Sequence, residues 1–302
     1  MKMRHDVPLS QFSTFRIGGP ADFLIFAETK DHVEEALQFA EEKHLPVFFL
    51  GGGSNVLFSD FGFRGLVICL KNRNVIEESP GIFCVEAGVP NVLFYAYAKE
   101  RHRDFSPFFT IPGTIGGAIA GNAGVPQGEI KDVLLSAEVF HISQKKWEEV
   151  STSFFRFSYR HSCFHEDPAL CKEILIWSAR VSLPEKLPNE IEQTAHAFLQ
   201  KRKETQPWGM TGGSFFRNPS EGAAGFFLEQ SGMKGQQVGD AFFSEKHANF
   251  LMNAGRATQR DIIDLAKMGI SAVWKSFSIL LSPEVRILDE FGNEVPLSLE
   301  HL

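Results

Sequence analysis

Apolar positions in the first fifty residues follow first a strand pattern, then a helical one, and then a strand pattern again. Residues 22–26 form a short apolar strand candidate, and Thr29 can cap a helix that runs to about Lys43. The apolar face of this helix would carry Val33, Ala36, Leu37 and Ala40. Residues 47–50 make a second strand candidate. The pattern predicts a β–α–β unit that ends directly at a run of glycines.

Strand patterns dominate the middle of the chain. Apolar segments bounded by turn residues predict strands over 66–70, 82–87, 134–141 and 174–181, with one helix near 92–100. The polar, amphipathic stretch 189–204 predicts a helix that connects two domains. We therefore expect a first domain of residues 1–190, with subdomains of about 1–65 and 66–190, and a second domain of residues 191–302.

The second domain shows one long helical pattern that begins at Thr258. Apolar residues recur there at helical spacing, at Ile262, Ala266, Ile270, Val273 and Phe277. Residues 278–281 then predict a strand. Neither internal repeats nor low-complexity tracts are present.

Length and composition indicate a folded protein of two domains. The chain has 302 residues, more than one hydrophobic core usually serves, and its 43% hydrophobic and 22% charged residues argue against disorder. The net charge of −7 argues against nucleic acid as the main partner. No apolar run approaches the roughly 20 residues that span a bilayer, and residues 1–6 lack the apolar core of a signal peptide. We expect a cytoplasmic protein without a membrane partner.

The four cysteines, Cys69, Cys84, Cys163 and Cys171, show no CxxC spacing. Reduced and mostly buried thiols are therefore expected rather than disulfides or a zinc site, and no metal site is predicted.

The run Gly51-Gly52-Gly53-Ser54-Asn55 follows the strand candidate 47–50 with nothing between. Residues without side chains let several backbone N–H groups turn toward one point, which suits a phosphate; a tight surface turn is the alternative. Residues 56–58 continue as strand rather than helix, and the GxGxxG spacing is absent, which argues against a dinucleotide-binding Rossmann domain.

A second glycine-rich run spans residues 111–124 and is far richer in glycine than a turn requires. Two separate surfaces lined by backbone suggest one large, extended cofactor. A third group lies at residues 212–219, where glycines precede Ser214 and where Arg217 and Asn218 offer an anion contact and an amide. A loop hydroxyl that bonds the backbone is the plainer interpretation of Ser214. No G-x-S-x-G elbow is present, so a hydrolase nucleophile is not supported.

Six motifs occur in the order seen in the UDP-N-acetylenolpyruvoylglucosamine reductase family, which this chain closely resembles. They are TFRIGGPA at 14–21, GGGSN at 51–55, IPGTIGGAIAGNAG at 111–124, FSYR at 157–160, GSFFRNP at 213–219 and PEVR at 283–286. Members are FAD-dependent enzymes that make UDP-N-acetylmuramate for bacterial peptidoglycan. The resemblance implies an α+β fold, with an FAD-binding domain of the vanillyl-alcohol-oxidase type made of two α+β subdomains, followed by an α+β substrate-binding domain.

The same resemblance implies which residues bind FAD. The pyrophosphate would lie on residues 51–55 and the flavin along residues 111–124, with Arg16 helping to hold the cofactor. The full set is Arg16, Gly51, Gly52, Gly53, Ser54, Asn55, Ile111, Pro112, Gly113, Thr114, Gly116, Gly117, Ala118, Asn122, Ala123 and Gly124.

The chemistry that the resemblance implies has two half-reactions at one flavin. NADPH reduces FAD and leaves, and hydride then passes from flavin N5 to the β-carbon of the enolpyruvyl group. Ser214 matches the proton donor to the α-carbon, while Arg160 and Glu284 would stabilise the enol-like intermediate and Tyr159 belongs to the same catalytic set. Arg160 could instead be a solvated surface charge, and Glu284 could be the partner of Arg286, which lies on the same strand face.

For the substrate, UDP-N-acetylglucosamine enolpyruvate, the expected binding residues are Arg217, Asn218, Gln237 and Lys246. The chain lacks the tyrosine-bearing insertion of the family's longer form, which indicates the shorter form, and we expect a monomer. Two alternatives remain: another FAD oxidoreductase of the same fold, acting on alcohols or sugars, and a flavin or nucleotide sensor without turnover.

Overall fold

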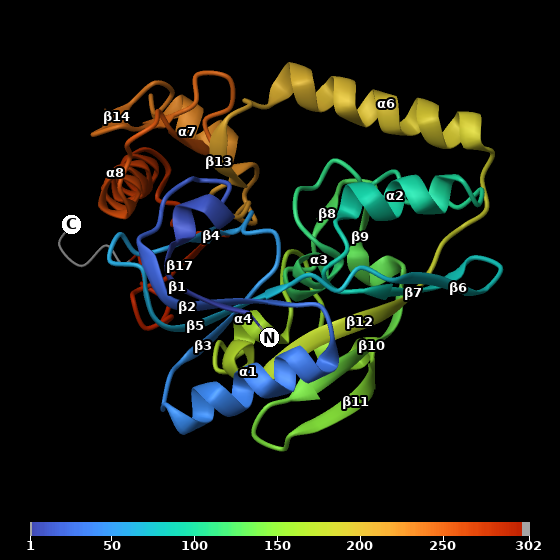
Figure 1. The fold of residues 1–302 in the computed structure, drawn as a ribbon. Coiled ribbons are helices and arrows are strands. Elements are labelled where there is room, and N and C mark those ends of the chain that lie inside the picture. Colours follow the sequence, from blue (N-terminus) through green and yellow to red (C-terminus); the bar gives the residue numbers. More distant parts are fainter. Residues whose placement is uncertain (1, 298–302) are drawn as a thin grey trace. The chain divides into compact units, whose positions relative to one another are not determined.

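The computed structural model describes residues 2–297, and its chain forms two compact units (Figure 1). Unit 1 consists of residues up to Arg4, Leu24–Gly52 and Leu66–Lys201, whereas unit 2 consists of His5–Phe23, Gly53–Gly65 and the residues from Arg202 on. The chain therefore changes unit several times before residue 66. The predicted division into residues 1–190 and 191–302 stays a prediction.

The predicted β–α–β pattern is confirmed at the start of the chain. Strand β2 (Pro20–Ala27), helix α1 (Lys30–Glu42) and strand β3 (Val47–Leu50) follow one another, and the Thr29 hydroxyl caps α1 by accepting from the His32 N–H at 3.2 Å. Strand β5 (Phe63–Leu70) pairs parallel with β3, and the sheet order is β1-β2-β5-β3, with β1 at Met3–Pro8. Thus β5 separates the two strands that flank α1.

The second sheet of unit 1 has the order β11-β10-β12-β7-β6 and is antiparallel in every pair (Figure 1). Its strands are β6 (Val75–Ser79), β7 (Ile82–Glu86), β10 (Leu134–His141), β11 (Lys146–Ser151) and β12 (Ile174–Ser182). The four strands predicted in this region are confirmed within one or two residues, apart from β5, which begins three residues earlier. Helix α2 (Asn91–Lys99) confirms the predicted helix.

Short elements fill the connections of unit 1. Helix α3 (Ile115–Ala120) begins inside the second glycine run and packs against β7 and β12. The others are the hairpin β8 (Gly124–Val125) and β9 (Gly128–Glu129), the 3-10 turns η2 (Ile130–Asp132) and η3 (Thr152–Phe155), and the helices α4 (Cys163–Glu166) and α5 (Leu170–Glu173).

Unit 2 is built on a four-stranded sheet of order β13-β16-β15-β14, covered by helix α8 (Gln259–Phe277). The strands are β13 (Met210–Ser214), β14 (Gln237–Val238), β15 (Ala241–Phe243) and β16 (Phe250–Asn253), and helix α7 (Ala224–Gln230) packs on α8. Strand β4 (Val56–Leu57) pairs parallel with β17 (Arg286–Ile287), and the turn η1 (Leu9–Phe12) also lies in this unit.

The amphipathic pattern of α8 builds the core of unit 2. Ile262, Ala266, Ile270 and Val273 are all buried, as the helical spacing predicts, whereas Phe277 at the last turn stays partly exposed and packs on Phe227. Thr258 and Asp261 form a capping box, in which the Asp261 N–H donates to the Thr258 hydroxyl at 3.1 Å and the Thr258 N–H donates to the Asp261 carboxylate at 2.8 Å.

The strand predicted over 278–281 is wrong. Ser278 adopts a left-handed conformation with φ 57°, and its N–H closes the end of α8 by donating to the Trp274 carbonyl at 2.8 Å. The apolar residues that follow form no strand. Leu281 is buried, with 3% of its surface exposed, whereas Leu280 is 59% exposed. The strand prediction failed because such a short apolar run does not distinguish a strand from a loop.

Helix α6 (Pro188–Thr205) confirms the predicted connecting helix within one residue at each end. All four cysteines are free thiols, and burial raises the pKa of Cys69 to about 12. Over residues 2–297, no helix combines the length and the hydropathy needed to cross a bilayer.

Candidate active site

The two glycine runs meet in unit 1. A Cβ atom on Gly52 would lie 2.6 Å from the Gly113 Cα, and one on Gly51 would lie 2.8 Å from the Thr114 hydroxyl oxygen. Side chains at these positions would force the runs apart, so glycine is needed here for their packing as well as for access by a ligand. Residues 61 and 63 positions apart in the sequence thus form one surface.

Gly53 belongs to unit 2 and has a different reason to be glycine. Its φ is +63°, and a Cβ there would lie 1.8 Å from the Phe12 carbonyl oxygen. Its own carbonyl accepts from the Thr14 N–H at 3.0 Å, which joins the third glycine of the run to the motif at 14–21. In that motif Arg16 is exposed, has φ 58° and donates to the Gln11 carbonyl at 3.2 Å.

The backbone donors of the two runs differ. At the start of α3 the N–H groups of Ile115, Gly116 and Gly117 donate to the Val89 carbonyl, the Ala87 carbonyl and the Thr114 hydroxyl. Among the described residues, by contrast, the N–H groups of Gly51, Gly52 and Gly53 donate to no protein acceptor. Consecutive backbone donors without protein partners fit the pyrophosphate of FAD. The N–H groups of Gly51, Gly52 and Gly53 are therefore compatible with the predicted phosphate cradle, and the assignment of residues 51–55 to FAD stays a prediction.

Arg160 lies at the tip of a tight turn in unit 1. The backbone groups of Ser158 and His161 exchange two hydrogen bonds, at 3.1 and 3.0 Å, so that Tyr159 and Arg160 form the bend. Arg160 has φ 51°, an uncommon conformation for a residue with a side chain. Its side chain is 16% exposed, whereas Tyr159 is mostly exposed and lies under the guanidinium at 5.5 Å. Arg160 is therefore not the solvated surface charge of the plainer interpretation.

Glu129 contacts Arg160 twice. Its carboxylate accepts from the Arg160 backbone N–H at 3.4 Å and lies 3.6 Å from the guanidinium Nη1. The guanidinium also donates to the carbonyls of Gly124 and, at 3.3 Å, of Asn122. The carbonyls at the end of the second glycine run therefore help to hold the arginine.

Asn122, predicted to bind the cofactor, is fully buried with φ 44°. Its side-chain nitrogen donates to the Ser158 carbonyl at 2.7 Å and to Glu129 at 3.1 Å. Since both of its side-chain N–H groups are used inside the protein, the side chain of Asn122 connects the glycine run to the turn at 158–161.

The segments that hold Ser214 and Glu284 lie next to each other in unit 2. Ser214 ends β13, and the carbonyl of the next residue, Phe215, accepts from the Glu284 N–H at 2.7 Å. The Glu284 carbonyl accepts from the Asn55 side chain at 3.1 Å. Across residues 2–297 the Ser214 hydroxyl bonds no protein group. It is therefore available to a ligand, unlike a loop hydroxyl that satisfies the backbone.

Asn249 clamps the segment that follows Ser214. Its side chain accepts from the Phe216 N–H at 2.9 Å and donates to the Phe216 carbonyl at 2.8 Å, and the Asn249 carbonyl accepts from Phe215 at 2.8 Å. Arg286, the alternative partner of Glu284, pairs with Glu294 at 2.8 Å.

The predicted substrate residues lie in different parts of unit 2. The Arg217 backbone donates to the Ser282 carbonyl at 3.0 Å, and its buried side-chain Nε has no hydrogen-bond partner within the described part of the chain. Asn218 accepts from the Ala224 N–H at 3.0 Å. The exposed Gln237 donates to the Gly239 carbonyl in a hairpin, and Lys246 donates to the Lys203 carbonyl near the end of α6.

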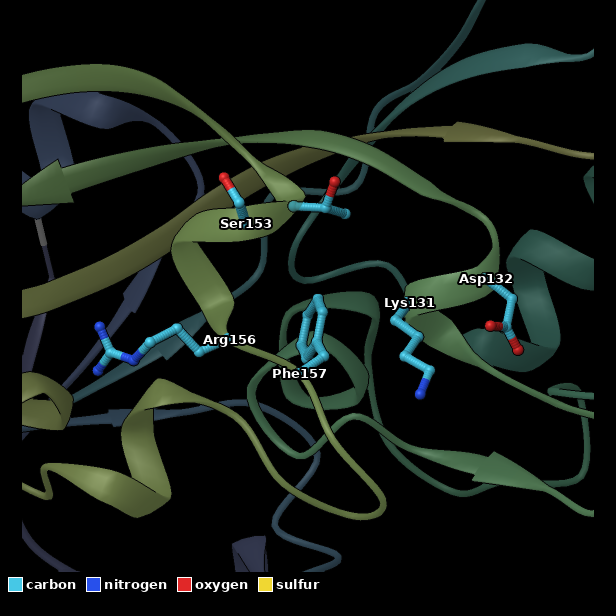
Figure 2. Close-up of a pocket in the computed structure, with 6 residues that line it drawn as sticks. Lys131, Asp132, Ser153, Arg156 and Phe157 are labelled. Carbon is cyan, nitrogen blue, oxygen red and sulfur yellow. The ribbon is translucent and has the colours of Figure 1, made fainter.

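A shallow hollow of about 430 Å³ lies elsewhere on unit 1 (Figure 2). It is lined by Lys131, Asp132, Thr152, Ser153, Arg156 and Phe157, and Figure 2 shows Phe157 between the two cations. Both cations are already paired, Lys131 with Glu129 at 2.9 Å and Arg156 with Glu166. No predicted site residue lines the hollow, so we do not include it in the candidate active site.

Sequence analysis did not single out Glu129 or Asn249. Glu129 follows the second glycine run by five residues, but it is one of 37 acidic residues, and its burial depends on the turn at 158–161. Asn249 lies 33 positions from its partner Phe216. No local pattern in the sequence marks either contact.

Comparison with known families defines the class of protein. The family model of the FAD binding domain matches residues 21–144, which hold both glycine runs. Together with the free backbone donors of the first run, this match makes the chain an FAD-binding oxidoreductase with an α+β fold.

The particular family follows from the rest of the chain. The family model of the UDP-N-acetylenolpyruvoylglucosamine reductase C-terminal domain matches residues 205–288. The reductase of that name from Synechococcus sp. (strain RCC307) is 35% identical over 298 residues, which is 97% of this chain and 96% of the relative. The one from Caldanaerobacter subterraneus subsp. tengcongensis is 35% identical over 293 residues, at 96% and 94% coverage.

A solved structure agrees with these matches. The crystal structure of UDP-N-acetylenolpyruvylglucosamine reductase from Thermus caldophilus superposes with a TM-score of 0.80 at 30% identity, covering 95% of this chain and 99% of that one. This chain therefore belongs to the UDP-N-acetylenolpyruvoylglucosamine reductase family, which confirms the resemblance found in the six motifs.

Proposed function

We propose that this chain reduces UDP-N-acetylglucosamine enolpyruvate to UDP-N-acetylmuramate for bacterial peptidoglycan, with NADPH as the reductant, as a cytoplasmic monomer. Membership of the reductase family supports the reaction and its cofactors, FAD and NADPH. The observation that carries the assignment of residues is the Ser214 hydroxyl, which bonds no described protein group and lies one residue from the backbone contact of Phe215 with Glu284.

FAD, when bound, takes a hydride from NADPH and gives a hydride to the β-carbon of the enolpyruvyl group. This chain's residues supply the rest of the reaction. As the β-carbon gains hydride, negative charge develops on the α-carbon and its carboxylate, and Ser214 donates the proton that the α-carbon needs. Hydride and proton together add two hydrogens across the double bond, and the reaction is balanced.

Glu284 and Arg160 support that proton transfer in different ways. A serine hydroxyl is a poor acid alone, and Glu284, joined to the Ser214 segment by the 2.7 Å bond to Phe215, is the group in unit 2 that can return a proton to it. Arg160 carries a fixed positive charge that stabilises the enol-like intermediate, and Tyr159 lies under its guanidinium.

Substrate capture depends on local cations because the chain as a whole carries a net charge of −7. Arg217 is the best supported of the predicted substrate residues, because its buried Nε lacks a partner among residues 2–297 and such a donor gains from binding a phosphate oxygen. Asn218, Gln237 and Lys246 are weaker candidates, since each uses a side-chain atom in a bond within the protein.

The test is Ser214→Ala, read in each half-reaction by stopped-flow absorbance. The variant loses one oxygen atom that bonds no described protein group, so folding and FAD content should stay normal. Reduction of the flavin by NADPH should keep its rate, whereas reoxidation by the enolpyruvyl substrate should slow by about 10² to 10⁴ because a general acid is lost.

Thr211→Val serves as the matched control in the same strand. The Thr211 hydroxyl accepts only from the Gly213 N–H, at 3.2 Å, and has no role in the proposed chemistry, so both half-reactions should stay within a few-fold of normal. An unchanged reoxidation rate in Ser214→Ala would remove Ser214 as the proton donor. Loss of the NADPH phase would indicate a structural role, and reoxidation by oxygen with an alcohol substrate would favour another FAD oxidoreductase.

A further inference from the structure

One carboxylate, that of Glu129, contacts Arg160 at two points. Glu129 accepts from the Arg160 backbone N–H at 3.4 Å and lies 3.6 Å from its guanidinium, so a single side chain touches both the backbone and the charge of the same residue. The two side chains are 14% and 16% exposed. At such burial an ion pair is screened less by water than a surface pair.

Glu129 is in turn held from three sides. Its carboxylate accepts from Asn122 at 3.1 Å and from the Lys131 ammonium at 2.9 Å, and its backbone N–H donates to Asp132 at 2.8 Å. The hydrogen bond to Glu129 raises the pKa of Lys131. Two cations, Lys131 and Arg160, therefore share the carboxylate of Glu129.

A second arginine–glutamate pair of unit 1, Arg156 with Glu166, serves as a comparison for Arg160 and Glu129. Arg156 and Glu166 touch only through their side chains, which are 54% and 41% exposed. Arg156 is also left-handed, with φ 45°, but its backbone N–H donates to the Ser153 carbonyl at 3.3 Å. Glu129 differs because its side chain is only 14% exposed and because it accepts from the backbone N–H of the arginine with which it pairs. A left-handed residue with a side chain persists only where its surroundings hold it.

We propose that Glu129 is a positioning residue for Arg160. It fixes the turn at 158–161 and the direction of the guanidinium, and Asn122 and Lys131 fix Glu129. This inference rests on the proposed role of Arg160 in stabilising the charge of the intermediate. Glu129 itself takes no part in the chemistry.

A double-mutant cycle tests this inference with Glu129→Gln, Arg160→Ala and the double variant. The readout is the rate of flavin reoxidation by the enolpyruvyl substrate, with flavin reduction by NADPH as the internal control. Glu129→Gln alone should slow reoxidation by about 10- to 100-fold, the cost of a misplaced group, and leave reduction within about twofold. In the Arg160→Ala background the same change should have almost no further effect, because the two residues act as one unit.

The control is Glu78→Gln, which removes a carboxylate from the largely exposed Arg180 pair at 2.8 Å, away from the turn at 158–161, and should leave both half-reactions unchanged. An equal slowing by Glu129→Gln with and without Arg160 would overturn the inference, and so would normal reoxidation in Glu129→Gln when Arg160→Ala is slow. If Arg160→Ala itself reoxidises normally, the proposed role of Arg160 has failed instead. If Glu129→Gln loses its flavin, Glu129→Asp replaces it in the double-mutant cycle with Arg160→Ala. This variant keeps the charge but withdraws it by one methylene, and the same results support or overturn the inference.

Discussion

The turn that carries Arg160 and the two segments that carry Ser214 and Glu284 are held by different kinds of contact. Around Arg160, side chains add to the backbone contacts of the turn, since Glu129 contacts the guanidinium and is itself bonded by Asn122 and Lys131. Around Ser214 the contacts come from the backbone, through the bonds of Phe215 to Glu284 and to Asn249.

This difference predicts how each region responds to substitution. A side chain held by other side chains loses its position when a neighbour changes, even one that never touches the substrate. A residue held by its backbone keeps its position when its own side chain is shortened. Variants near Arg160 should therefore change the rate through geometry, whereas variants at Ser214 should change the chemistry alone.

Arg160→Ala should have the largest effect of the variants that sharpen this comparison. The loss of a fixed charge beside the developing negative charge should slow flavin reoxidation by about 10² to 10³. Flavin reduction by NADPH should keep its rate, because hydride transfer to the flavin develops no charge on the enolpyruvyl carboxylate. Stopped-flow absorbance separates the two phases, and equal slowing of both would show that the arginine supports the flavin site as a whole.

Asn249→Ala breaks a side-chain clamp in the region that is held mainly by backbone contacts. Asn249 and Phe216 are buried, and the change leaves the Phe216 N–H and carbonyl without their partners at 2.9 and 2.8 Å. We expect a loss of about 2–3 kcal/mol in unfolding free energy, measured by urea denaturation. Ser214→Ala, in contrast, should leave stability unchanged, and a similar loss in both variants would contradict the distinction.

Arg217→Ala should raise the KM for the UDP substrate about tenfold with a smaller change in kcat, since a hydrogen bond to a charged group is worth about 1.5–3 kcal/mol. The effect of the arginine should weaken as salt increases. Initial rates at two ionic strengths measure it. Damage to flavin reduction would point instead to a structural role for this side chain.

Thr258→Ala should have the smallest effect and serves as a control for stability alone. It removes the hydroxyl that accepts from Asp261 at 3.1 Å at the start of α8, which costs about 1 kcal/mol of unfolding free energy. Both half-reactions should proceed at normal rates at 25 °C. A change in either rate would mean that a loss of stability alone affects the half-reactions, so that a rate change in Asn249→Ala could have the same cause.

Much of the secondary structure could be predicted because the signals are local. The Thr29 and Thr258 caps, the strand at 47–50 and the buried face of α8 all follow from residues within a few positions of one another. The insertion of β5 beside β3 could not be predicted, because strand order depends on partners distant in the sequence. The strand expected at 278–281 failed because a run of three apolar residues does not distinguish a strand from a loop.

The candidate site, like the secondary structure, could be predicted from the sequence only in part. The motifs mark Ser214, Glu284 and the glycine runs as candidate site residues, but the packing of Gly52 on Gly113 depends on the tertiary structure. The motifs also do not show that Asn122 is used inside the protein or that Glu129 is buried. These contacts join residues that lie 7 to 61 positions apart, and no periodicity relates them.

The most direct test of the central claim, that one bound flavin serves both half-reactions, is an anaerobic absorption experiment on the unaltered protein. NADPH is added first, and UDP-N-acetylglucosamine enolpyruvate is added once the spectrum is steady. We predict that the protein purifies with FAD, that NADPH bleaches the flavin absorbance, and that the substrate restores it with one equivalent of UDP-N-acetylmuramate formed. A flavin that NADPH does not bleach, or one that the substrate does not reoxidise, would contradict the account.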